Sequence, residues 1–432
     1  MRVLVIGSGA REHALAARLA SDTAVTEVLA APGNPGIATV ARLLPVDVSK
    51  VGDVSALAGA HHIDLTVVGP EVPLSQGIVD RFAADGRLIF GPTAAAARLE
   101  SSKAFAKAFM ARHGVPTARF EICSDADRAL QIVRSDAFGF PVVLKADGLA
   151  AGKGVVVAGD RAAAEAAIAD AMQSHKFGAA GDRLVIEECL RGPEVSFFVI
   201  SDGTRARPIG TAQDHKRIFD DDRGPNTGGM GAFAPSPLVD AALETRVMRE
   251  IVEPVIAGMA ADGTPFRGFL YVGLMLTTDG PKVIEFNVRF GDPEAQVVLP
   301  LIDEPLAPLL VAAARGELRQ TAIRIAHDRF AGVVLASRGY PESSDSGRVI
   351  TGIEAAESLP GISVYHAGTA VRDGHLLTAG GRVLTVVGRG SSFTEAIARA
   401  YAGVAKIEFD GMQFRHDIGR KALRAESTKY EV

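Results

Sequence analysis

The first hundred residues alternate short apolar runs with turns that contain glycine. Residues 3–6 form a continuous apolar run before Gly7-Ser-Gly-Ala-Arg11, and residues 12–20 then carry apolar positions at helical spacing. Similar runs at residues 65–68 and 88–90 precede Gly69-Pro-Glu71 and Gly91-Pro-Thr93. This rhythm predicts a parallel α/β sheet at the amino-terminal end of the chain.

The turns after these strands form a candidate ligand site, because ligands of parallel sheets bind beyond the carboxyl ends of the strands. The candidates there are Gly9, Arg11, Glu71 and Thr93. A dinucleotide is not expected, because the first loop lacks the third glycine of the G-x-G-x-x-G dinucleotide-binding fingerprint. The second strand, residues 27–31, also leads into Pro-Gly rather than into the acidic residue that would bind the ribose. A phosphate at the start of the following helix and a purely structural turn both remain open.

The pattern changes after Ser101, where Ser102-Lys103 leads an amphipathic helix that Gly114-Val-Pro116 ends. Strand-like runs at residues 141–145, 155–158 and 183–188 surround an alanine-rich helix. We therefore expect an amino-terminal α/β substrate-binding domain at residues 1–103. A second domain at residues 104–325 would carry a small α+β lobe at about residues 120–190.

The rest of the chain predicts further strands and one long loop. Residues 194–200 and 206–211 resemble strands, and residues 214–237 are polar and rich in glycine, which is typical of a functional loop. A helix is expected at residues 244–259. Residues 268–277 and 282–290 predict a hairpin around Asp279-Gly280. The remaining apolar runs, at residues 331–337, 363–367 and 382–387 with a helix at 394–405, predict a carboxyl-terminal α+β domain at residues 326–432.

Composition narrows the classes of protein. The 432 residues are too many for one ordinary core, and 47% hydrophobic with 22% charged residues is typical of a globular protein. A net charge of -5 gives no general attraction to nucleic acid. The first apolar run is too short to span a membrane, and two cysteines are too few for a disulfide framework. We expect a cytoplasmic monomer without a nucleic-acid or membrane partner.

The strand predicted at residues 282–290 is the most informative pattern. Alternation places Ile284, Phe286, Val288 and Phe290 on one face, toward the core. The other face carries Glu285, Asn287 and Arg289. A carboxylate and an amide oxygen suit a hard cation, and an arginine suits a phosphate. A solvent-facing polar edge is the alternative, but Asp292 and Glu294 add two carboxylates at the end of this strand.

The loop from Gly148 to Gly154 is not a Walker A loop, since it has one residue too few between its glycines and glycine where Ser or Thr must stand. Its place between two apolar strands predicts a hairpin lid whose N–H groups close over phosphates. Positive charge for a triphosphate comes from Lys103, Lys107, Lys145 and Lys153, although single lysines are more often surface groups. Lys145 ends an apolar strand and therefore needs an anionic partner.

Taken together, the motifs resemble one family of the ATP-grasp superfamily, the glycinamide ribonucleotide synthetases. The resemblance rests on residues 5–13, 68–71, 145–154, 214–217, 224–231 and 284–294, and it extends to residues 414–418. It implies an ATP-grasp core with a small mobile lid lobe. The implied enzyme is a phosphoribosylamine glycine ligase of purine biosynthesis that uses ATP with Mg²⁺ or Mn²⁺. Glycine would become glycyl phosphate, and 5-phosphoribosylamine would then displace phosphate to give glycinamide ribonucleotide.

The resemblance also implies roles for individual residues. Metal would be held by Glu285 and Asn287. ATP would be bound by Lys103, Lys145, Gly148, Gly152, Lys153, Gly154, Glu187, Cys189 and Glu194. Glycine and phosphoribosylamine would be bound by Gly9, Ala10, Arg11, Pro70, Glu71, Asp214, Lys216, Arg289 and Asp292. The catalytic residues among these would be Arg289, Lys145, Asp214 and Lys216.

One segment departs from the family pattern, and two other readings stay open. Residues 218–223 are more apolar at their start and more basic at their end than the connector usual in this family. Whether this loop closes over the site is therefore left undecided by the sequence. His215 would orient the loop or be a hydrogen-bonded structural histidine.

An ATP-grasp enzyme with another acceptor is one alternative, although no Met-Lys-Met carrier motif for biotin is present. A nucleotide-binding regulator without turnover is the other, but it would not need Glu285, Asn287 and Arg289 together.

Overall fold

The amino-terminal part is a parallel five-stranded sheet, as predicted. The computed structural model describes residues 1–149, 154–174, 176 and 178–429, so Gly152 and Lys153 of the predicted lid lie outside the described residues. The sheet has the order β3-β2-β1-β4-β5. Its strands are β1 (Arg2–Gly7), β2 (Glu27–Pro32), β3 (Arg42–Leu43), β4 (Leu65–Val68) and β5 (Ile89–Phe90). Its helices are α1 (Ala10–Ala20), α2 (Val51–Ala60), α3 (Glu71–Ser75), α4 (Ile78–Ala84) and α5 (Ala94–Ser101).

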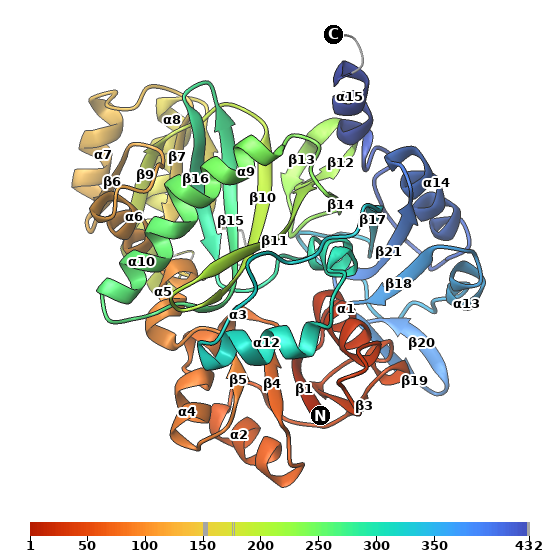
Figure 1. Ribbon diagram of the computed structural model, residues 1–432. Coiled ribbons are helices and arrows are strands. Elements are labelled where there is room, and N and C mark those ends of the chain that lie inside the picture. Colours follow the sequence, from red (N-terminus) through yellow and green to blue (C-terminus); the bar gives the residue numbers. More distant parts are fainter. Residues whose placement is uncertain (150–153, 175, 177, 430–432) are drawn as a thin grey trace.

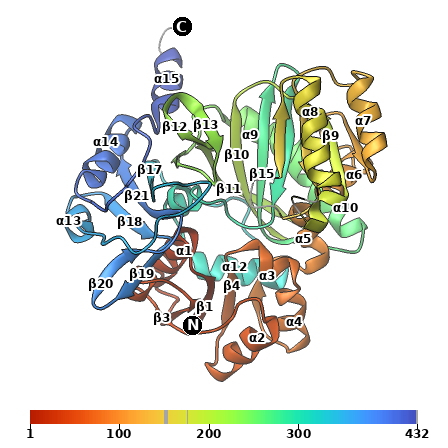
Figure 2. The same cartoon turned by 180° about the vertical axis from the view of Figure 1, so that it is seen from behind.

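A separate antiparallel sheet forms a lobe beside the large sheet of the molecule (Figure 1). Its strands, in spatial order, are β6 (Phe120–Cys123), β9 (Leu184–Glu188), β7 (Val142–Ala146) and β8 (Val155–Ala158). The helices α7 (Ala126–Arg134) and α8 (Arg161–Ile168) share a hydrophobic core with these strands. Figure 2 shows α8 in front of them. The helix α6 (Lys103–Arg112) leads into the lobe, and the Ser102 hydroxyl accepts a hydrogen bond from its Phe105 N–H.

An eight-stranded sheet forms the centre of the molecule and continues into the carboxyl-terminal region. Its order is β16-β15-β10-β11-β14-β17-β21-β18. The strands are β10 (Glu194–Asp202), β11 (Ala206–Asp214), β14 (Gly231–Ala234), β15 (Arg267–Thr277), β16 (Gly280–Asn287), β17 (Arg329–Ala336), β18 (Ile362–His366) and β21 (Arg382–Gly390). Because β14 pairs with β17, one hydrogen-bonded sheet crosses the domain boundary expected at residue 326.

The remaining elements cover this sheet or extend from it. The helices are α9 (Ala241–Val247), α10 (Glu253–Ala261), α11 (Ala295–Val298), α12 (Leu306–Arg315), α13 (Ile353–Glu357), α14 (Phe393–Val404) and α15 (Arg420–Lys429). Two ribbons complete the fold, β12 (Arg217–Phe219) with β13 (Arg223–Asn226) and β19 (Thr369–Arg372) with β20 (His375–Thr378). Figure 1 places the amino-terminal sheet at the bottom and the carboxyl-terminal strands at the right.

Aromatic packing joins the amino-terminal sheet to the central one. Phe90 of β5 meets Phe269 of β15 edge to face with ring centroids 4.6 Å apart, and Phe269 lies 4.2 Å from Phe290. Phe290 also packs on Phe198 of β10. These side chains are buried, so the two sheets share one hydrophobic core near the end of β16.

Two sequence expectations are wrong in detail. The long loop expected at residues 214–237 contains the ribbon β12–β13 and the buried strand β14, whose short Gly231-Ala-Phe-Ala234 run lies among turn-like glycines. The regular alternation expected along residues 282–290 fails at Ile284. There Leu274 pairs with Val283 and the adjacent Gly273 pairs with Glu285, so Ile284 is the extra residue of a β-bulge. Ile284 is therefore half-buried beside Glu285 instead of lying in the core with Phe286.

Candidate active site

A cavity lies between the central strands β10, β11, β15 and β16. Four of the residues that the sequence nominated meet there, and its full lining is Glu194, Val195, Ser196, Asp214, Lys216, Tyr271, Gly273, Leu274, Ile284 and Glu285. The β-bulge brings the apolar Ile284 and the acidic Glu285 to the same cavity. A lining of apolar side chains with a few convergent charged groups is typical of small-molecule sites.

Lys216 is held between two carboxylates in this cavity. Its Nζ atom forms an ion pair of 2.5 Å with Oε2 of Glu194. Desolvation acts to lower the pKa of Lys216, but Asp214 and Glu194 outweigh it and raise this pKa well above the ordinary value. Lys216 therefore stays protonated at neutral pH. Burial raises the pKa of Asp214.

Two residues of the lining, Ser196 and Tyr271, form a buried polar group with Glu294, and sequence analysis missed both of them. The Ser196 hydroxyl is 3.2 Å from the Tyr271 hydroxyl and 3.2 Å from Oε1 of Glu294. Burial, followed by the nearby Asp214 carboxylate, raises the pKa of Glu294 to about 7. The sequence offered only the position of Glu294 after Asp292. Nothing in the local pattern indicated Ser196 or Tyr271.

Lysines of the antiparallel lobe and of α6 lie near the cavity, since Lys145 contacts the backbone of Ile284 in its lining. Lys145 and Lys107 both form ion pairs with Glu187, and the Lys145 ammonium also donates to the Ile284 carbonyl at 3.0 Å. The predicted anionic partner of Lys145 is thus Glu187. Lys103 donates to the Gly148 carbonyl at 2.8 Å, and burial lowers its pKa.

Lys107 differs from the other lysines in its surroundings. Its side chain is buried, and its ammonium donates to the Thr117 hydroxyl at 2.7 Å as well as pairing with Glu187. Burial lowers the pKa of Lys107 to about 8 against the opposing effect of Glu187. Lys107 supports Glu187 from the interior, so the expectation that it supplies charge to a triphosphate is not favoured. Cys189 lies just beyond β9, is half-buried, and is absent from the cavity lining.

Glu285 and Asn287 fit a divalent cation. They stand two residues apart on β16, beyond the bulge, and both are half-buried. Among the described residues no side chain forms an ion pair or hydrogen bond with the Glu285 carboxylate, and no group of three or more His, Cys, Asp or Glu gathers. Mg²⁺ commonly takes one or two protein oxygens and completes its shell with water and phosphate, so this small donor set suits it.

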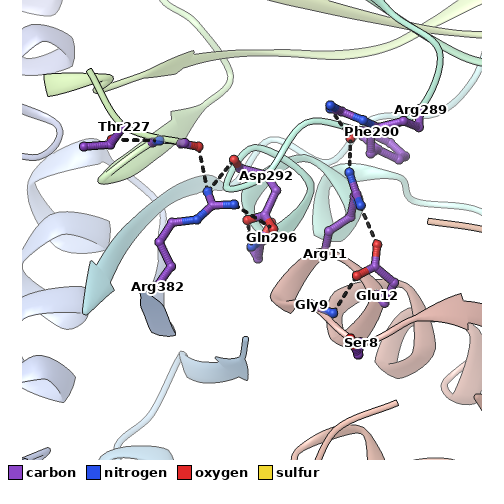
Figure 3. A network of polar contacts seen from close by, with 12 residues as sticks. Ser8, Gly9, Arg11, Glu12, Thr227, Arg289, Phe290, Asp292, Gln296 and Arg382 are labelled. Carbon is purple, nitrogen blue, oxygen red and sulfur yellow. Dashed lines mark hydrogen bonds and ion pairs between the residues drawn. The ribbon is translucent and has the colours of Figure 1, made fainter. Parts of the chain in front are cut away.

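A second cluster surrounds Arg289, just beyond the end of β16. Figure 3 shows Arg289 with Phe290 and Arg11. Arg289 pairs through Nε with Glu71 at 3.1 Å and through Nη2 with Glu100 at 2.7 Å. Burial acts to lower the pKa of Arg289, but Glu100 and Glu71 raise it above the ordinary value. Glu100 was missed by sequence analysis, because it lies in α5 with no neighbouring motif. Its Oε2 atom also accepts the Val288 N–H at 2.8 Å.

The first-strand loop joins this cluster through Arg11 and Glu12. Arg11 forms an ion pair of 2.5 Å with Glu12 and donates to the Phe290 carbonyl at 3.2 Å. Glu12 also accepts the Gly9 N–H at 2.6 Å. A Cβ atom on Gly7 or Gly69 would collide with the Glu12 side chain, so these glycines allow Glu12 to lie between the two turns. Pro70 is the residue before α3 and places Glu71 at the first turn.

Asp292 lies next to this cluster. Its Oδ1 atom accepts from Gln296 at 2.9 Å, and its Oδ2 atom is 3.3 Å from Nη2 of Arg382. The structure thus brings Glu194, Asp214, Lys216 and Glu285 into one group, the Lys216 group. It brings Arg11, Glu71, Arg289 and Asp292 into a second, the Arg289 group. Glu294 adjoins the Lys216 group through its 3.2 Å contact with the Ser196 hydroxyl, and its charge also helps to raise the pKa of Arg289.

Fold and site together define a protein of the ATP-grasp class. A family model described as "Phosphoribosylglycinamide synthetase, ATP-grasp (A) domain" matches residues 101–295. The N-domain and C-domain models of the same family match residues 1–100 and 330–421. The chain belongs to the phosphoribosylglycinamide synthetase family.

Individual relatives agree with this membership. The phosphoribosylamine–glycine ligase of Xylella fastidiosa (strain Temecula1) is 53% identical over 99% of this chain and 100% of its own. That of Neisseria meningitidis serogroup A is 49% identical over 98% of this chain and 100% of its own. The predictions of family and of an enzyme of the ligase class are confirmed.

Solved structures confirm the predicted fold class. The phosphoribosylamine–glycine ligase of Thermotoga maritima matches with a TM-score of 0.82 at 33% identity, covering 96% of this chain and 100% of its own. The biotin carboxylase of Campylobacter jejuni matches with a TM-score of 0.72 at 16% identity over 96% and 92%, which shows a shared fold alone. Within the described ranges no helix is both long and apolar enough to cross a membrane.

Proposed function

We propose that this chain joins glycine to 5-phosphoribosylamine at the expense of ATP. The products are glycinamide ribonucleotide, ADP and phosphate, and the reaction belongs to de novo purine biosynthesis. Full-length identity of 53% to a phosphoribosylamine–glycine ligase supports this proposal. The single structural observation that carries it is the ion pair between Lys216 and Glu194, because it sets a proposed substrate residue against a proposed nucleotide residue in one cavity.

The ATP side would use the lobe and the central strands. Lys103 and Lys145 would meet the phosphates, while the backbone from Gly148 to Gly154, including Gly152 and Lys153, would close over them. Glu187, the Cys189 backbone and Glu194 would frame adenine and ribose, with Ile284 supplying an apolar surface. Lys145 can exchange Glu187 for phosphate, since both partners are anionic and Lys107 still neutralises Glu187.

Glu285 and Asn287 would hold Mg²⁺ or Mn²⁺. When bound, the ion supplies positive charge that neutralises the transferring phosphoryl group. The protein's own contribution is placement of the two oxygens on one face of β16, beside the cavity and close to Lys103. Preorganised charge of this kind stabilises a transition state without reorganisation during the reaction.

The acceptor side would use the two groups around Lys216 and Arg289. Protonated Lys216 would hold an oxygen of the glycine carboxylate and of the resulting glycyl phosphate, and Asp214 would orient the ammonium of Lys216. Arg289 and Asp292, with the turns at Gly9, Ala10, Arg11, Pro70 and Glu71, would orient phosphoribosylamine. A positioned amine and exclusion of water both favour ligation over hydrolysis of an acyl phosphate.

A coupled assay of ADP formation across pairs of amines and amino acids tests the proposal. ADP should form at a productive rate when glycine and 5-phosphoribosylamine are both present, and omission of either should abolish it. ATP hydrolysis that is indifferent to glycine would contradict the proposed reaction. The monomeric state and the cytoplasmic location stay predictions.

A further inference from the structure

Arg382 stands at the start of β21 and reaches two turns beside the proposed acceptor site (Figure 3). Its Nη1 atom donates to the Gly228 carbonyl at 2.6 Å and to the Asp292 carbonyl at 2.7 Å. Its Nη2 atom is 3.3 Å from the Asp292 carboxylate. One guanidinium therefore joins a turn that follows β13 to a turn that follows β16.

The two turns are in direct contact. A Cβ atom on Gly229 would collide with Pro293, and Gly229 has a φ of +108°, a conformation that favours glycine. Gly228 is also held from the carboxyl-terminal region by Tyr340, whose hydroxyl accepts the Gly228 N–H at 2.9 Å. The position of the first turn thus depends on Arg382 and Tyr340 as well as on Pro293.

Each turn controls a residue of the proposed site. Thr227 donates to the Lys216 carbonyl through its N–H at 2.7 Å and through its hydroxyl at 2.9 Å, so the first turn fixes the backbone of Lys216. Asp292 of the second turn lies beside Gly9, whose added Cβ atom would be 3.7 Å from the carboxylate. Arg382 accordingly links the Lys216 group to the Arg289 group, to which Asp292 belongs.

The environment makes this link strong. The Arg382 side chain is only 23% exposed and the Asp292 side chain 17%. Burial acts to lower the pKa of Arg382, but Asp292, Tyr340 and Glu294 together raise it above the ordinary value. Hydrogen bonds from a partly desolvated guanidinium to carbonyls and a carboxylate are stronger than neutral ones.

We propose that Arg382 is a positioning residue for the acceptor side of the active site. By holding Gly228 and Asp292 on one guanidinium, it fixes the separation of Lys216 and Asp292 and so sets affinity for glycine and the amine but not for ATP. The inference rests on the proposed function. Lysine can replace this fork only in part, because its one ammonium nitrogen cannot occupy both the Nη1 position that serves the two carbonyls and the Nη2 position that faces the carboxylate.

Steady-state kinetics with three variants test the inference. Arg382→Met should raise the KM for glycine and for phosphoribosylamine by about tenfold or more, the scale of one charged hydrogen bond, and change the KM for ATP by less than about twofold. Arg382→Lys should restore part of this loss. The matched control is Arg348→Met, in the same region, since Arg348 pairs with Asp345 and Asp410 at the surface. It should leave all three constants unchanged.

Equal rises in all three KM values, or unchanged glycine and amine KM values in a folded Arg382→Met enzyme, would overturn the inference. Should Arg382→Met fail to fold, Tyr340→Phe removes the single hydroxyl that binds the Gly228 N–H of the same turn. This variant should give a smaller rise in the KM values for glycine and for phosphoribosylamine, again without a rise in the KM for ATP. An unselective effect of Tyr340→Phe would also count against the role of this turn.

Amide hydrogen exchange does not depend on enzyme turnover, so it tests this inference separately from the proposed function. Native enzyme that forms no ADP in response to glycine would refute the proposed function before any variant is compared. Amide hydrogen exchange at Gly228 and Gly229 should be faster by about tenfold in Arg382→Met and unchanged in Arg348→Met, because lost local contacts lower protection. Unchanged exchange at this turn in Arg382→Met would overturn the positioning role alone.

Discussion

Arg415 donates through Nη1 to the carboxylate of Asp222 at 2.8 Å, although 193 residues separate them in the sequence. The Arg415 side chain is fully buried and also binds Asp417 through two hydrogen bonds of 2.7 Å and the Arg217 carbonyl at 3.1 Å. The ribbon β12–β13, which follows Lys216 directly, is thereby fastened to the segment before α15. The acidic run 220–222 has its basic partners in this segment and at the start of α15, namely Arg415, His416, Arg420 and Lys421.

The first prediction concerns this buried arginine. Arg415→Met should lower the free energy of unfolding by about 3 kcal/mol, because removal of the arginine leaves the buried Asp417 carboxylate without compensation. Urea unfolding measures the difference. Arg338→Met is the control, since Arg338 pairs with Asp410 at the surface and should contribute less than about 1 kcal/mol. A loss in Arg415→Met no larger than in the control would show that the ribbon is held by other contacts.

The second prediction concerns the proposed metal ligand. Glu285→Gln should fold normally and lose about 3 kcal/mol of transition-state stabilisation, roughly a hundredfold in kcat, on the scale of one electrostatic contact. It should also need more Mg²⁺ for half-maximal rate. Kinetics at varied Mg²⁺ check both effects beside Glu250→Gln, a surface substitution in the helical segment Met248–Val252. Full activity of Glu285→Gln would remove this residue from the metal site.

The third prediction concerns pH and Glu294 in the protein without nucleotide or metal. The folded pKa of about 7 lies above the ordinary value of 4.5, so the folded state holds the proton more tightly than the unfolded state. This stability is present below about pH 4.5 and is lost as pH rises through 7, a change on the order of 3 kcal/mol.

Glu294→Gln cannot lose this proton. Its free energy of unfolding relative to the native protein should therefore improve between pH 5 and pH 8, by an amount on the order of 3 kcal/mol. Urea unfolding at both pH values is the measurement, and Glu342→Gln on the surface serves as control. An equal pH response in the native protein and in Glu294→Gln would argue that Glu294 is ionised throughout.

The fourth prediction concerns Lys107 and its support of Glu187. Lys107→Met should leave the Glu187 carboxylate to Lys145 alone, so that ATP phosphate must compete with an unshared ion pair. The KM for ATP should rise by about tenfold, one charged contact, while the KM for glycine stays within about twofold. Lys176→Met is the control, since Lys176 pairs with Asp170 at the surface of the lobe. A rise in the glycine KM alone would contradict the proposed role.

Local patterns in the sequence were sufficient for most strands and for the three glycine-containing turns of the amino-terminal sheet. Apolar runs such as residues 3–6 and 65–68 are contiguous, so their burial on both faces can be inferred without knowledge of the partners. The same holds for the hairpin of β15 and β16, since Asp279-Gly280 marks its turn. These features depend on neighbours in the sequence.

Features that depend on distant neighbours were missed. The bulge at Ile284 exists only in the register with β15, and Glu100 becomes meaningful only where it meets Arg289, 189 residues away. Closure of residues 218–223 was left open because their charged partners lie at Arg415 and beyond. The pattern of apolar and polar residues around these positions carries no information about partners so distant in the sequence.

The continuous sheet from β14 to β17 also bears on how the enzyme is made. Synthesis runs from the amino terminus, so the antiparallel lobe and strands β10 to β16 leave the ribosome before β17 and β21 exist. Until then β14 has an open edge, and the turn at Gly228 lacks Arg382 and Tyr340. A nascent chain can therefore form its antiparallel lobe early, whereas the proposed acceptor site is completed only after β21 has been translated.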